Sequence, residues 1–368
     1  MAESRLQQLS KLRQSVWIDY LSRRLLREGE LEELMREHAV VGVTSNPTIF
    51  QKAISEGDAY DEQLREVLAG KDDAKEVFLE LAVKDVQDAC DLLREVWDGG
   101  DGKDGYVSIE VDPNLADDTD ATTAEAQRLH ELVDRPNCFV KIPATKAGLP
   151  AIEEMISRGR NINVTLIFSL QRYAEVVEAY LRGLERLVEA GGDPAKVASV
   201  ASFFVSRVDT EADRRLDEAG APDELKGKLA VANAKLAYQS WKELFAGERW
   251  EALRSKGATT QRCLWASTST KNPAYRDVLY VEDLIGPETV NTMPEETIAA
   301  FEDHGEVALT LEHDLDEARR VFERVAEAGV DYDDVVATLE REGVQKFADS
   351  FAELLDGIRA KRGELVSA

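Results

Sequence analysis

The sequence has few of the residues that bind metals or form disulfides. Its three cysteines, Cys90, Cys138 and Cys263, lie far apart, and its four histidines show no ligand spacing. Neither a disulfide framework nor a metal site is therefore predicted. We expect the cysteines to be small buried hydrophobes in a reducing compartment.

Long apolar runs are absent as well. No stretch of about 18 apolar residues occurs, which argues against a membrane-spanning helix. The N-terminal segment is charged and has no apolar core of the kind found in signal peptides. We therefore expect a soluble, cytoplasmic protein.

Basic residues are scarce relative to acidic ones. Lys and Arg total 45 and Asp and Glu total 72, so the formal net charge is −27. Such a charge argues against nucleic acid and anionic membranes as partners. Any anionic substrate would have to be bound by a few local cations within a repelling field.

The glycine-rich loops that hold nucleotide phosphates are also absent. Neither GxGxxG nor GxxxxGK[ST] follows any apolar run of the sequence. A nucleotide-binding sheet is therefore not indicated, and we expect no cofactor.

The sequence does contain eight short apolar runs separated by helical patterns. Such runs are typical of parallel strands buried on both faces, and eight of them favour a closed (β/α)8 TIM barrel over an open doubly wound sheet. The predicted strands are residues 16–21, 40–47, 106–112, 138–145, 162–168, 197–205, 262–267 and 290–293.

Helical periodicity fills the segments between these runs. From Leu79 to Trp97, for example, apolar residues recur at steps of three and four, which is one face of a helix. Residues 208–256 are mostly helical and longer than one crossover needs, which indicates a helical insertion after the sixth strand. With no linker or internal repeat, residues 1–368 are expected to form one domain. The other predicted helices are residues 4–14, 24–37, 120–134, 148–158, 170–189, 314–328 and 332–360.

A lysine, Lys141, lies in the middle of the fourth apolar run. A buried ammonium group without a partner is costly, so such a lysine is either paired or shifted toward the neutral amine. A neutral amine among apolar neighbours is the nucleophile that a Schiff-base enzyme needs. The alternative is a strand-end lysine that extends its charge to solvent. Polar residues on the other strands favour the first interpretation.

Polar side chains occur late in most of the other apolar runs. Because alternate residues of a strand face the same side, Thr165 should share its face with Asn163 and Ile167. If these faces point into a barrel, their polar groups meet at its C-terminal mouth, where such folds carry out chemistry. A single buried carboxylate could equally be a structural ion-pair partner, but a set spread over several strands is harder to explain by structure alone. The set is Asp19, Asn46, Glu110, Lys141, Asn163, Thr165 and Ser202.

The segments that carry these residues resemble the transaldolase family along almost the whole chain. The succession T-S-N-P, V-K-I-P-A-T, N-x-T-L and S-x-F-x-x-R is specific to that family. The length and the insertion after the sixth strand look like its longer bacterial form. The matching segments are residues 17–19, 42–48, 108–113, 140–145, 159–169 and 202–209.

The resemblance implies a TIM-barrel transferase of carbohydrate metabolism, in the pentose phosphate pathway. It would transfer a dihydroxyacetone unit from sedoheptulose 7-phosphate or fructose 6-phosphate to glyceraldehyde 3-phosphate or erythrose 4-phosphate. By the resemblance, Lys141 forms a Schiff base with the donor and Asp19 is the general base for carbon–carbon cleavage. Glu110 would move protons through a water near Thr165.

The resemblance also implies a set of substrate-binding residues. Asn46, Asn163 and Ser202 fall where the family binds the donor hydroxyls, and Phe204 would form a wall of the site. Arg207 matches the phosphate-binding arginine after the sixth strand. The second cation departs from the family pattern, because Lys271 stands near the position of an arginine and offers a point charge instead of a bidentate fork. The alternative for Lys271 is an exposed loop lysine.

Two other functions are compatible with such a barrel. One is a Schiff-base aldolase that releases dihydroxyacetone, although relatives of that type are much shorter and Glu110 is present here. The other is a catalytically silent barrel that acts as a scaffold, which no sequence feature favours. The sequence leaves open whether the protein is a monomer or a homo-oligomer.

Overall fold

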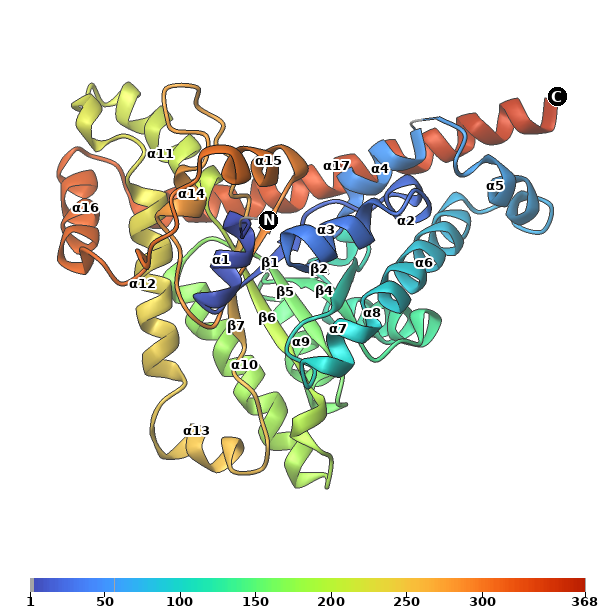
Figure 1. The fold of residues 1–368 in the computed structure, drawn as a ribbon, viewed down its shortest axis with the longest axis horizontal. Helices are drawn as coiled ribbons and strands as arrows, with labels where there is room; N and C mark the ends of the chain where they lie inside the picture. Colours follow the sequence, from blue (N-terminus) through green and yellow to red (C-terminus); the bar gives the residue numbers. More distant parts are fainter. Residues whose placement is uncertain (1–2, 56, 368) are drawn as a thin grey trace.

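Eight parallel strands form a closed barrel in the computed structural model, which describes residues 3–55 and 57–367 (Figure 1). Successive strands pair in chain order, and β1 closes the barrel by pairing with β8. The predicted (β/α)8 barrel is therefore confirmed. The strands are β1 (Gln14–Ile18), β2 (Val40–Val43), β3 (Tyr106–Glu110), β4 (Cys138–Pro143), β5 (Ile162–Ile167), β6 (Ser199–Phe204), β7 (Arg262–Ala266) and β8 (Thr289–Met293).

Helices surround the barrel and connect its strands (Figure 1). Several of them begin at side-chain caps: Asp118 accepts a hydrogen bond from the backbone N–H of Ala121, and Ser169 accepts one from Arg172. The helices up to β6 are α1 (Arg5–Lys11), α2 (Arg23–Arg27), α3 (Glu30–His38), α4 (Pro47–Ser55), α5 (Asp61–Leu68), α6 (Ala74–Leu92), α7 (Arg94–Gly99), η1 (Pro113–Leu115), α8 (Thr119–Val133), α9 (Gly148–Ser157), α10 (Leu170–Glu189) and η2 (Pro194–Lys196).

The predicted helical insertion lies between β6 and β7, and the last helices follow β7 and β8. Residues 332–360, predicted as one helix, form most of a longer helix, α17. These helices are α11 (Ser206–Glu218), η3 (Asp223–Leu225), α12 (Leu229–Leu244), α13 (Gly247–Arg254), α14 (Leu279–Glu282), α15 (Glu295–His304), α16 (Leu315–Glu327) and α17 (Tyr332–Ser367).

Three local predictions were wrong or incomplete. Residues 24–37 form two helices, because Gly29 adopts a left-handed conformation with φ 80° between them. Ile167 does not share the face of Thr165, since Leu166 has φ 59° and shifts the register. Helices α14 and α15 were not predicted from the periodicity.

Aromatic side chains fill the barrel below its polar end. Phe139 stacks on Tyr106 with ring centroids 4.2 Å apart, and Trp17 lies 6.1 Å from Phe139. Gly42 on the neighbouring strand makes room for the indole, because a Cβ there would lie 2.5 Å from a ring carbon of Trp17. The barrel is thus a packed core, and in folds of this kind the chemistry takes place at the C-terminal end.

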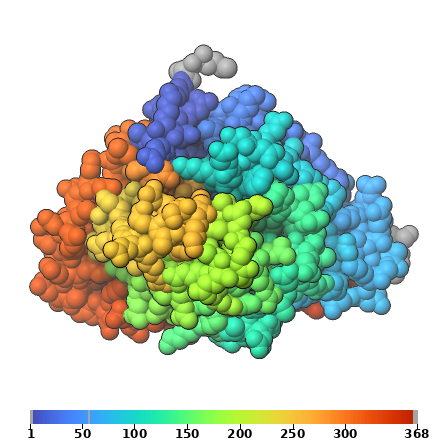
Figure 2. Space-filling view, turned by 90° about the horizontal axis from the view of Figure 1, so that it is seen from below, coloured from blue at the N-terminus to red at the C-terminus, as the bar shows by residue number. Residues whose placement is uncertain are grey.

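An ion pair closes the N-terminal end of the barrel. A nitrogen of the Arg262 guanidinium lies 2.9 Å from Asp104 Oδ1, and the Trp17 indole N–H donates to the same oxygen at 3.0 Å. Figure 2 views the molecule from below, where α13 (yellow to orange) and the end of α10 (yellow-green) lie on the visible face. The ion pair and the indole hydrogen bond thus tie β7 and β1 to Asp104.

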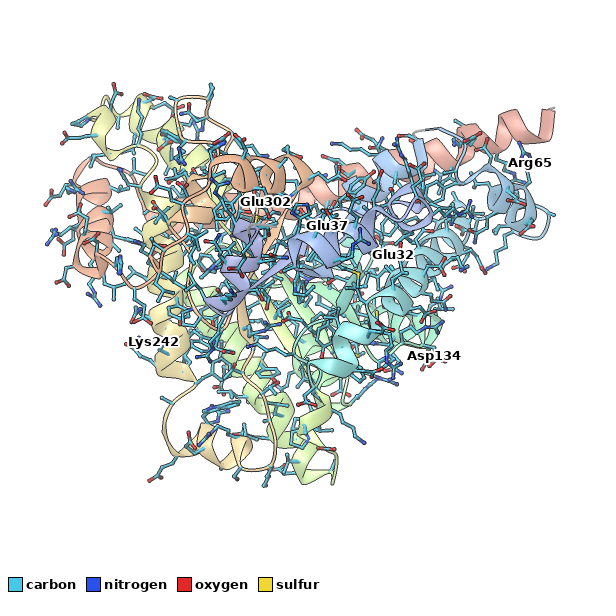
Figure 3. The ribbon with its side chains drawn as sticks, viewed as in Figure 1. Glu32, Glu37, Arg65, Asp134, Lys242 and Glu302 are labelled. Carbon is cyan, nitrogen blue, oxygen red and sulfur yellow. The ribbon has the colours of Figure 1, made fainter. Side chains whose placement is uncertain are left out.

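Exposed charges of both signs lie on the outer helices and loops. Glu302 is an exception with a structural role, because its Oε2 accepts a hydrogen bond from the backbone N–H of Arg5 at 3.0 Å, which fixes the start of α1 to α15 (Figure 3). The acidic excess of the sequence is thus mainly a property of the surface. Figure 3 labels Glu32, Glu37, Arg65, Asp134 and Lys242 as examples.

A buried carboxyl, Asp209, holds α11 in place. Its Oδ1 accepts a hydrogen bond from the backbone N–H of Ala230 at 2.7 Å, and its Oδ2 accepts one from the Tyr280 hydroxyl at 2.9 Å. Burial raises the pKa of Asp209 to about 7. Because α11 follows β6 directly, this anchor also fixes the residues that open α11 at the barrel mouth.

We expect Asp209 to make the protein less stable as pH rises from about 4 to about 7. A carboxyl with a raised pKa in the folded state contributes stability that is fully present below its unfolded-state pKa and is lost as pH rises through its folded-state pKa. The slope for one such group is about 1.4 kcal/mol per pH unit. Asp209→Asn should remove this component from urea unfolding curves measured between pH 5 and pH 8. Parallel pH profiles of the wild type and the variant would contradict the assignment.

Candidate active site

The central residue of the candidate site is Lys141, on the fully buried strand β4. Its Nζ lies 3.0 Å from Glu110 Oε2 on β3, and the side chains of the two residues are only 6% and 5% exposed. The same Nζ donates a hydrogen bond to the Ser45 carbonyl oxygen at 3.0 Å. The lysine is therefore paired inside the barrel, and the alternative in which it extends to solvent is wrong.

The second carboxyl, Asp19, lies directly after β1. Thr44 Oγ1 donates a hydrogen bond to Asp19 Oδ1 at 2.6 Å, and the same hydroxyl lies 2.7 Å from Thr292 Oγ1. Burial raises the pKa of Asp19, while the bond from Thr44 and the charge of Lys141 oppose that rise. Thr44 was not predicted as a site residue, because hydroxyls of this kind are common in strands and only the structure brings this one to Asp19.

Glu110 has a raised pKa for the same main reason. Burial raises the pKa of Glu110, the charge of Lys141 lowers it, and the charge of Asp19 raises it further. The charge of Asp19 therefore reaches Glu110 across the barrel mouth, and the charge of Lys141 acts on both carboxyls. Carboxyls with raised pKa values are suited to accept and return protons at neutral pH.

A line of polar groups continues from Lys141 to β5 and β6. Asn163 is the registered partner of Lys141, and its Nδ2 donates to Ser108 Oγ at 3.1 Å. Ser202 Oγ donates to Asn163 Oδ1 at 2.7 Å. Thr165 Oγ1 is buried and makes no hydrogen bond with the protein in residues 3–55 and 57–367. The structure thus brings Asn163 and Ser202 together beside Lys141, and it places Thr165 two residues further along β5, opposite Pro143.

Asn46 and Phe204 lie on either side of this line. Asn46 caps α4, since its Oδ1 accepts a hydrogen bond from the backbone N–H of Ile49 at 3.0 Å, and it follows the serine that contacts Lys141. Its side-chain NH2 group has no partner among the described residues. The Phe204 ring is 6% exposed and lies 5.2 Å from the Phe168 ring. Phe204 therefore packs at the mouth, at the end of β6.

Of the two predicted phosphate-binding cations, Arg207 belongs to the site and Lys271 to its margin. Arg207 stands in the first turn of α11, with its guanidinium carbon 5.2 Å from the centre of the Phe204 ring. Burial lowers the pKa of Arg207, whereas the charges of Asp19 and Glu110 raise it. Lys271 is exposed on the loop after β7, and its Nζ donates to Ser269 Oγ at 2.5 Å.

A residue of α17 that was not predicted for the site covers Lys141. The Phe347 ring lies 5.8 Å from Lys141 Nζ and 6.0 Å from the guanidinium carbon of Arg207, and it is 4% exposed. The apolar periodicity of α17 predicts that Phe347 is buried. It gives no sign that the ring packs on Lys141, some 200 residues earlier in the chain.

Two negative findings concern the described part of the chain. Among residues 3–55 and 57–367, no three or more His, Cys, Asp or Glu side chains form a group that could hold a metal ion. Within the same ranges, no helix is both long and apolar enough to span a bilayer.

Comparison with known proteins identifies close relatives of this chain. The family model described as "Transaldolase/Fructose-6-phosphate aldolase" matches residues 16–358. The chain is 53% identical over 361 residues to a protein of Frankia alni named "Transaldolase", with 97% of each chain covered. It is 52% identical to "Transaldolase 2" of Streptomyces avermitilis, with 97% of this chain and 96% of the relative covered. It is 53% identical to "Transaldolase" of Mycolicibacterium paratuberculosis, with 95% of each chain covered.

Proposed function

The chain belongs to the transaldolase/fructose-6-phosphate aldolase family, and from this premise we propose that it is a Schiff-base transaldolase. It transfers a dihydroxyacetone unit from sedoheptulose 7-phosphate or fructose 6-phosphate to glyceraldehyde 3-phosphate or erythrose 4-phosphate. The observation that carries the proposal is the buried pair of Lys141 and Glu110, 3.0 Å apart, with the carboxyl of Asp19 facing the same space.

The first step is formation of the imine. The ammonium of Lys141 passes a proton to Glu110, whose raised pKa favours this transfer, and the neutral amine attacks C2 of the donor ketose. The resulting carbinolamine loses water when Glu110 returns the proton to the departing hydroxyl. The buried hydroxyl of Thr165, which has no partner among the described residues, is suited to hold a water that relays these protons.

The second step is cleavage of the carbon–carbon bond. Asp19 accepts the proton of the C4 hydroxyl, the C3–C4 bond breaks, and its electron pair moves into the protonated imine to give an enamine. The aldose phosphate leaves, and the three-carbon enamine stays attached to Lys141. Hydrogen bonds to Asn46, Asn163 and Ser202 would hold its hydroxyls, because these groups lie around the lysine.

The third step reverses the second on a new aldehyde. The enamine carbon attacks the aldehyde carbon of the acceptor, and Asp19 returns its proton to the new hydroxyl. Hydrolysis of the imine then releases the product and regenerates Lys141. A cover of apolar side chains such as Phe347, 4% exposed, limits access of bulk water and so protects the enamine from early protonation.

An acceptor requirement tests this proposal against the aldolase alternative. With fructose 6-phosphate alone, a transaldolase forms a borohydride-trappable adduct but releases little dihydroxyacetone. With erythrose 4-phosphate present, it should produce sedoheptulose 7-phosphate and glyceraldehyde 3-phosphate. Equal rates of dihydroxyacetone release with and without the acceptor would identify an aldolase, and no adduct at all would identify a scaffold.

Phosphate recognition gives a further prediction. Arg207→Ala should raise KM for fructose 6-phosphate roughly 10–100-fold, because a charge-assisted bidentate contact is worth on the order of 1.5–3 kcal/mol. Lys271→Ala should cost less, since the lysine is exposed and offers a single point charge. Part of the Arg207 penalty should appear in kcat, because binding of a remote phosphate orients the reacting centre.

The control for phosphate recognition is a donor without phosphate. With unphosphorylated fructose, the KM and kcat of both variants should differ less from those of the wild type than they do with fructose 6-phosphate. If the differences persist undiminished, Arg207 and Lys271 shape the barrel mouth and do not bind phosphate.

A further inference from the structure

Helix α17 (red in Figure 1) passes over the C-terminal end of the barrel. Gly343 lies against β5, where an added Cβ would be 3.1 Å from Leu166 Cδ2 and 3.5 Å from the Phe168 ring. Seven residues later, Ser350 Oγ accepts a hydrogen bond from Thr48 Oγ1 of α4 at 2.8 Å. Residues 343–350 are therefore held at the barrel mouth at both ends.

Lys346 lies on the same side of α17 as the two residues that hold this segment at the barrel mouth. It is three residues after Gly343 and four before Ser350, so the three lie along one side of the helix. The next residue, Phe347, covers Lys141 and Arg207. Lys346 itself is exposed and makes no ion pair or hydrogen bond with the described residues.

The groups that act electrostatically on Lys346 are all cations. The charge of Arg207 is the largest cause of a lowered pKa at Lys346, followed by partial burial and by the charges of Lys271 and Lys52. No carboxylate is among these causes. We call Lys52, Arg207, Lys271 and Lys346 the rim cluster.

The members of the rim cluster form no ion pairs with the described residues. None of its four members has an ion-pair partner within residues 3–55 and 57–367, although acidic residues outnumber basic ones by 72 to 45 and most surface arginines are paired. The carboxyls of Asp19 and Glu110 act on Arg207, but the charges that act on Lys346 are all positive, and their repulsion costs free energy in the absence of an anion. A bound anion removes that cost.

We propose that Lys346 is a further specificity-determining residue, which binds the phosphate of the sugar phosphate together with Arg207 and Lys271. This rests on the proposed function. The carbonyl carbon of the donor is bound at Lys141, and its phosphate is at the opposite end of the sugar, so the phosphate must lie toward the rim of the barrel. Donor and acceptor both carry phosphate at that end, and the rim cluster therefore serves both half-reactions.

This assignment also explains how the site tolerates Lys271 in place of an arginine. A lysine offers one charged point of contact where an arginine offers a bidentate fork. A second lysine, supplied from α17, restores a second charged point of contact with the phosphate. The four-carbon stem of Lys346 allows its ammonium group to reach inward from an exposed backbone position.

The test measures binding of inorganic phosphate and of fructose 6-phosphate to variants of the full chain. Lys346→Ala should raise the competitive Ki of inorganic phosphate and the KM for fructose 6-phosphate about tenfold, at the low end of the range for a charge-assisted contact because the lysine is exposed. Lys346→Arg, which keeps the charge, should recover most of the loss. Arg341→Ala is the matched control: it removes one exposed positive charge from the same helix, two residues before Gly343 and on another side.

Calorimetric titration with inorganic phosphate separates this proposal from the proposed function. If the wild type transfers no three-carbon unit, the proposed function fails, but the phosphate Kd of the wild type and the variants still tests Lys346. If Lys346→Ala binds inorganic phosphate as the wild type does, or if Arg341→Ala weakens binding equally, the assignment of Lys346 is overturned. Equal urea unfolding midpoints of the wild type and Lys346→Ala would show that a weaker affinity does not come from loss of fold.

Discussion

Lys141→Ala protein treated with fructose 6-phosphate and borohydride will gain no covalent adduct, whereas the wild type will gain one per chain, on Lys141. The reason is that the amine of Lys141 is held inside the barrel 3.0 Å from Glu110 and close enough to Asp19 to lower the pKa of that carboxyl. Turnover should fall to background, because no other group can store the three-carbon unit as an enamine. Intact-mass measurement followed by peptide mapping checks both statements.

Two further variants control this experiment. Lys146→Ala removes an exposed lysine five residues away and should leave both the adduct and the turnover unchanged. Lys141→Met fills the volume of the lysine stem and guards against collapse of the site in Lys141→Ala. Removing the lysine leaves Glu110 buried without its partner, and breaking a buried pair costs on the order of 3–5 kcal/mol when the remaining charge persists. The raised pKa of Glu110 allows it to become neutral, so the fold should survive. An adduct mapped to another lysine would refute the assignment.

Asp19→Asn should accumulate the donor adduct and yet lose turnover by about 10²–10⁴-fold, the usual contribution of a general base. The amide still accepts the hydrogen bond that Thr44 donates to this position, so the geometry is preserved while the proton acceptor is lost. Imine formation does not need Asp19, since the carboxyl in contact with Lys141 is that of Glu110. Glu110→Gln should therefore show the opposite behaviour, with slow adduct formation.

Rapid quenching with borohydride distinguishes the two carboxyls. The time course of the adduct should match the wild type in Asp19→Asn and be slower by a similar 10²–10⁴-fold in Glu110→Gln. Equally fast adduct formation in both variants would refute this division of roles. It would leave the paired carboxyl with a structural function only.

Much of the barrel follows from local sequence. Strand β4 is predicted because its apolar run is bounded by Pro136 and by Pro143. A strand buried on both faces is expected to be apolar throughout, and this run is apolar at every position except one. The exception, Lys141, marks the site for the same reason: a charge within such a run is too costly to be accidental. The resemblance of the surrounding segments to a known family then implies the roles of the other residues.

Other features depended on contacts between distant parts of the chain. The ion pair of Lys141 and Glu110 requires β3 and β4 to be neighbours in register, and periodicity specifies which face a residue occupies but not its neighbour. The register shift at Leu166 could not be predicted. A positive φ at a leucine is a strained conformation that the surrounding barrel imposes, and no local sequence pattern indicates it.

The helix that covers the site could be predicted from the sequence, but its position over the site could not. The apolar face of a helix indicates that this face is buried, but it does not indicate which residues pack against it. The sequence alone therefore determined that the chain forms eight buried strands with a lysine in the fourth. The tertiary structure decided that α17 crosses the barrel mouth and packs Phe347 against that lysine, with Lys346 beside it on the same helix, because the contacts of a helix are set by the packing of the whole chain.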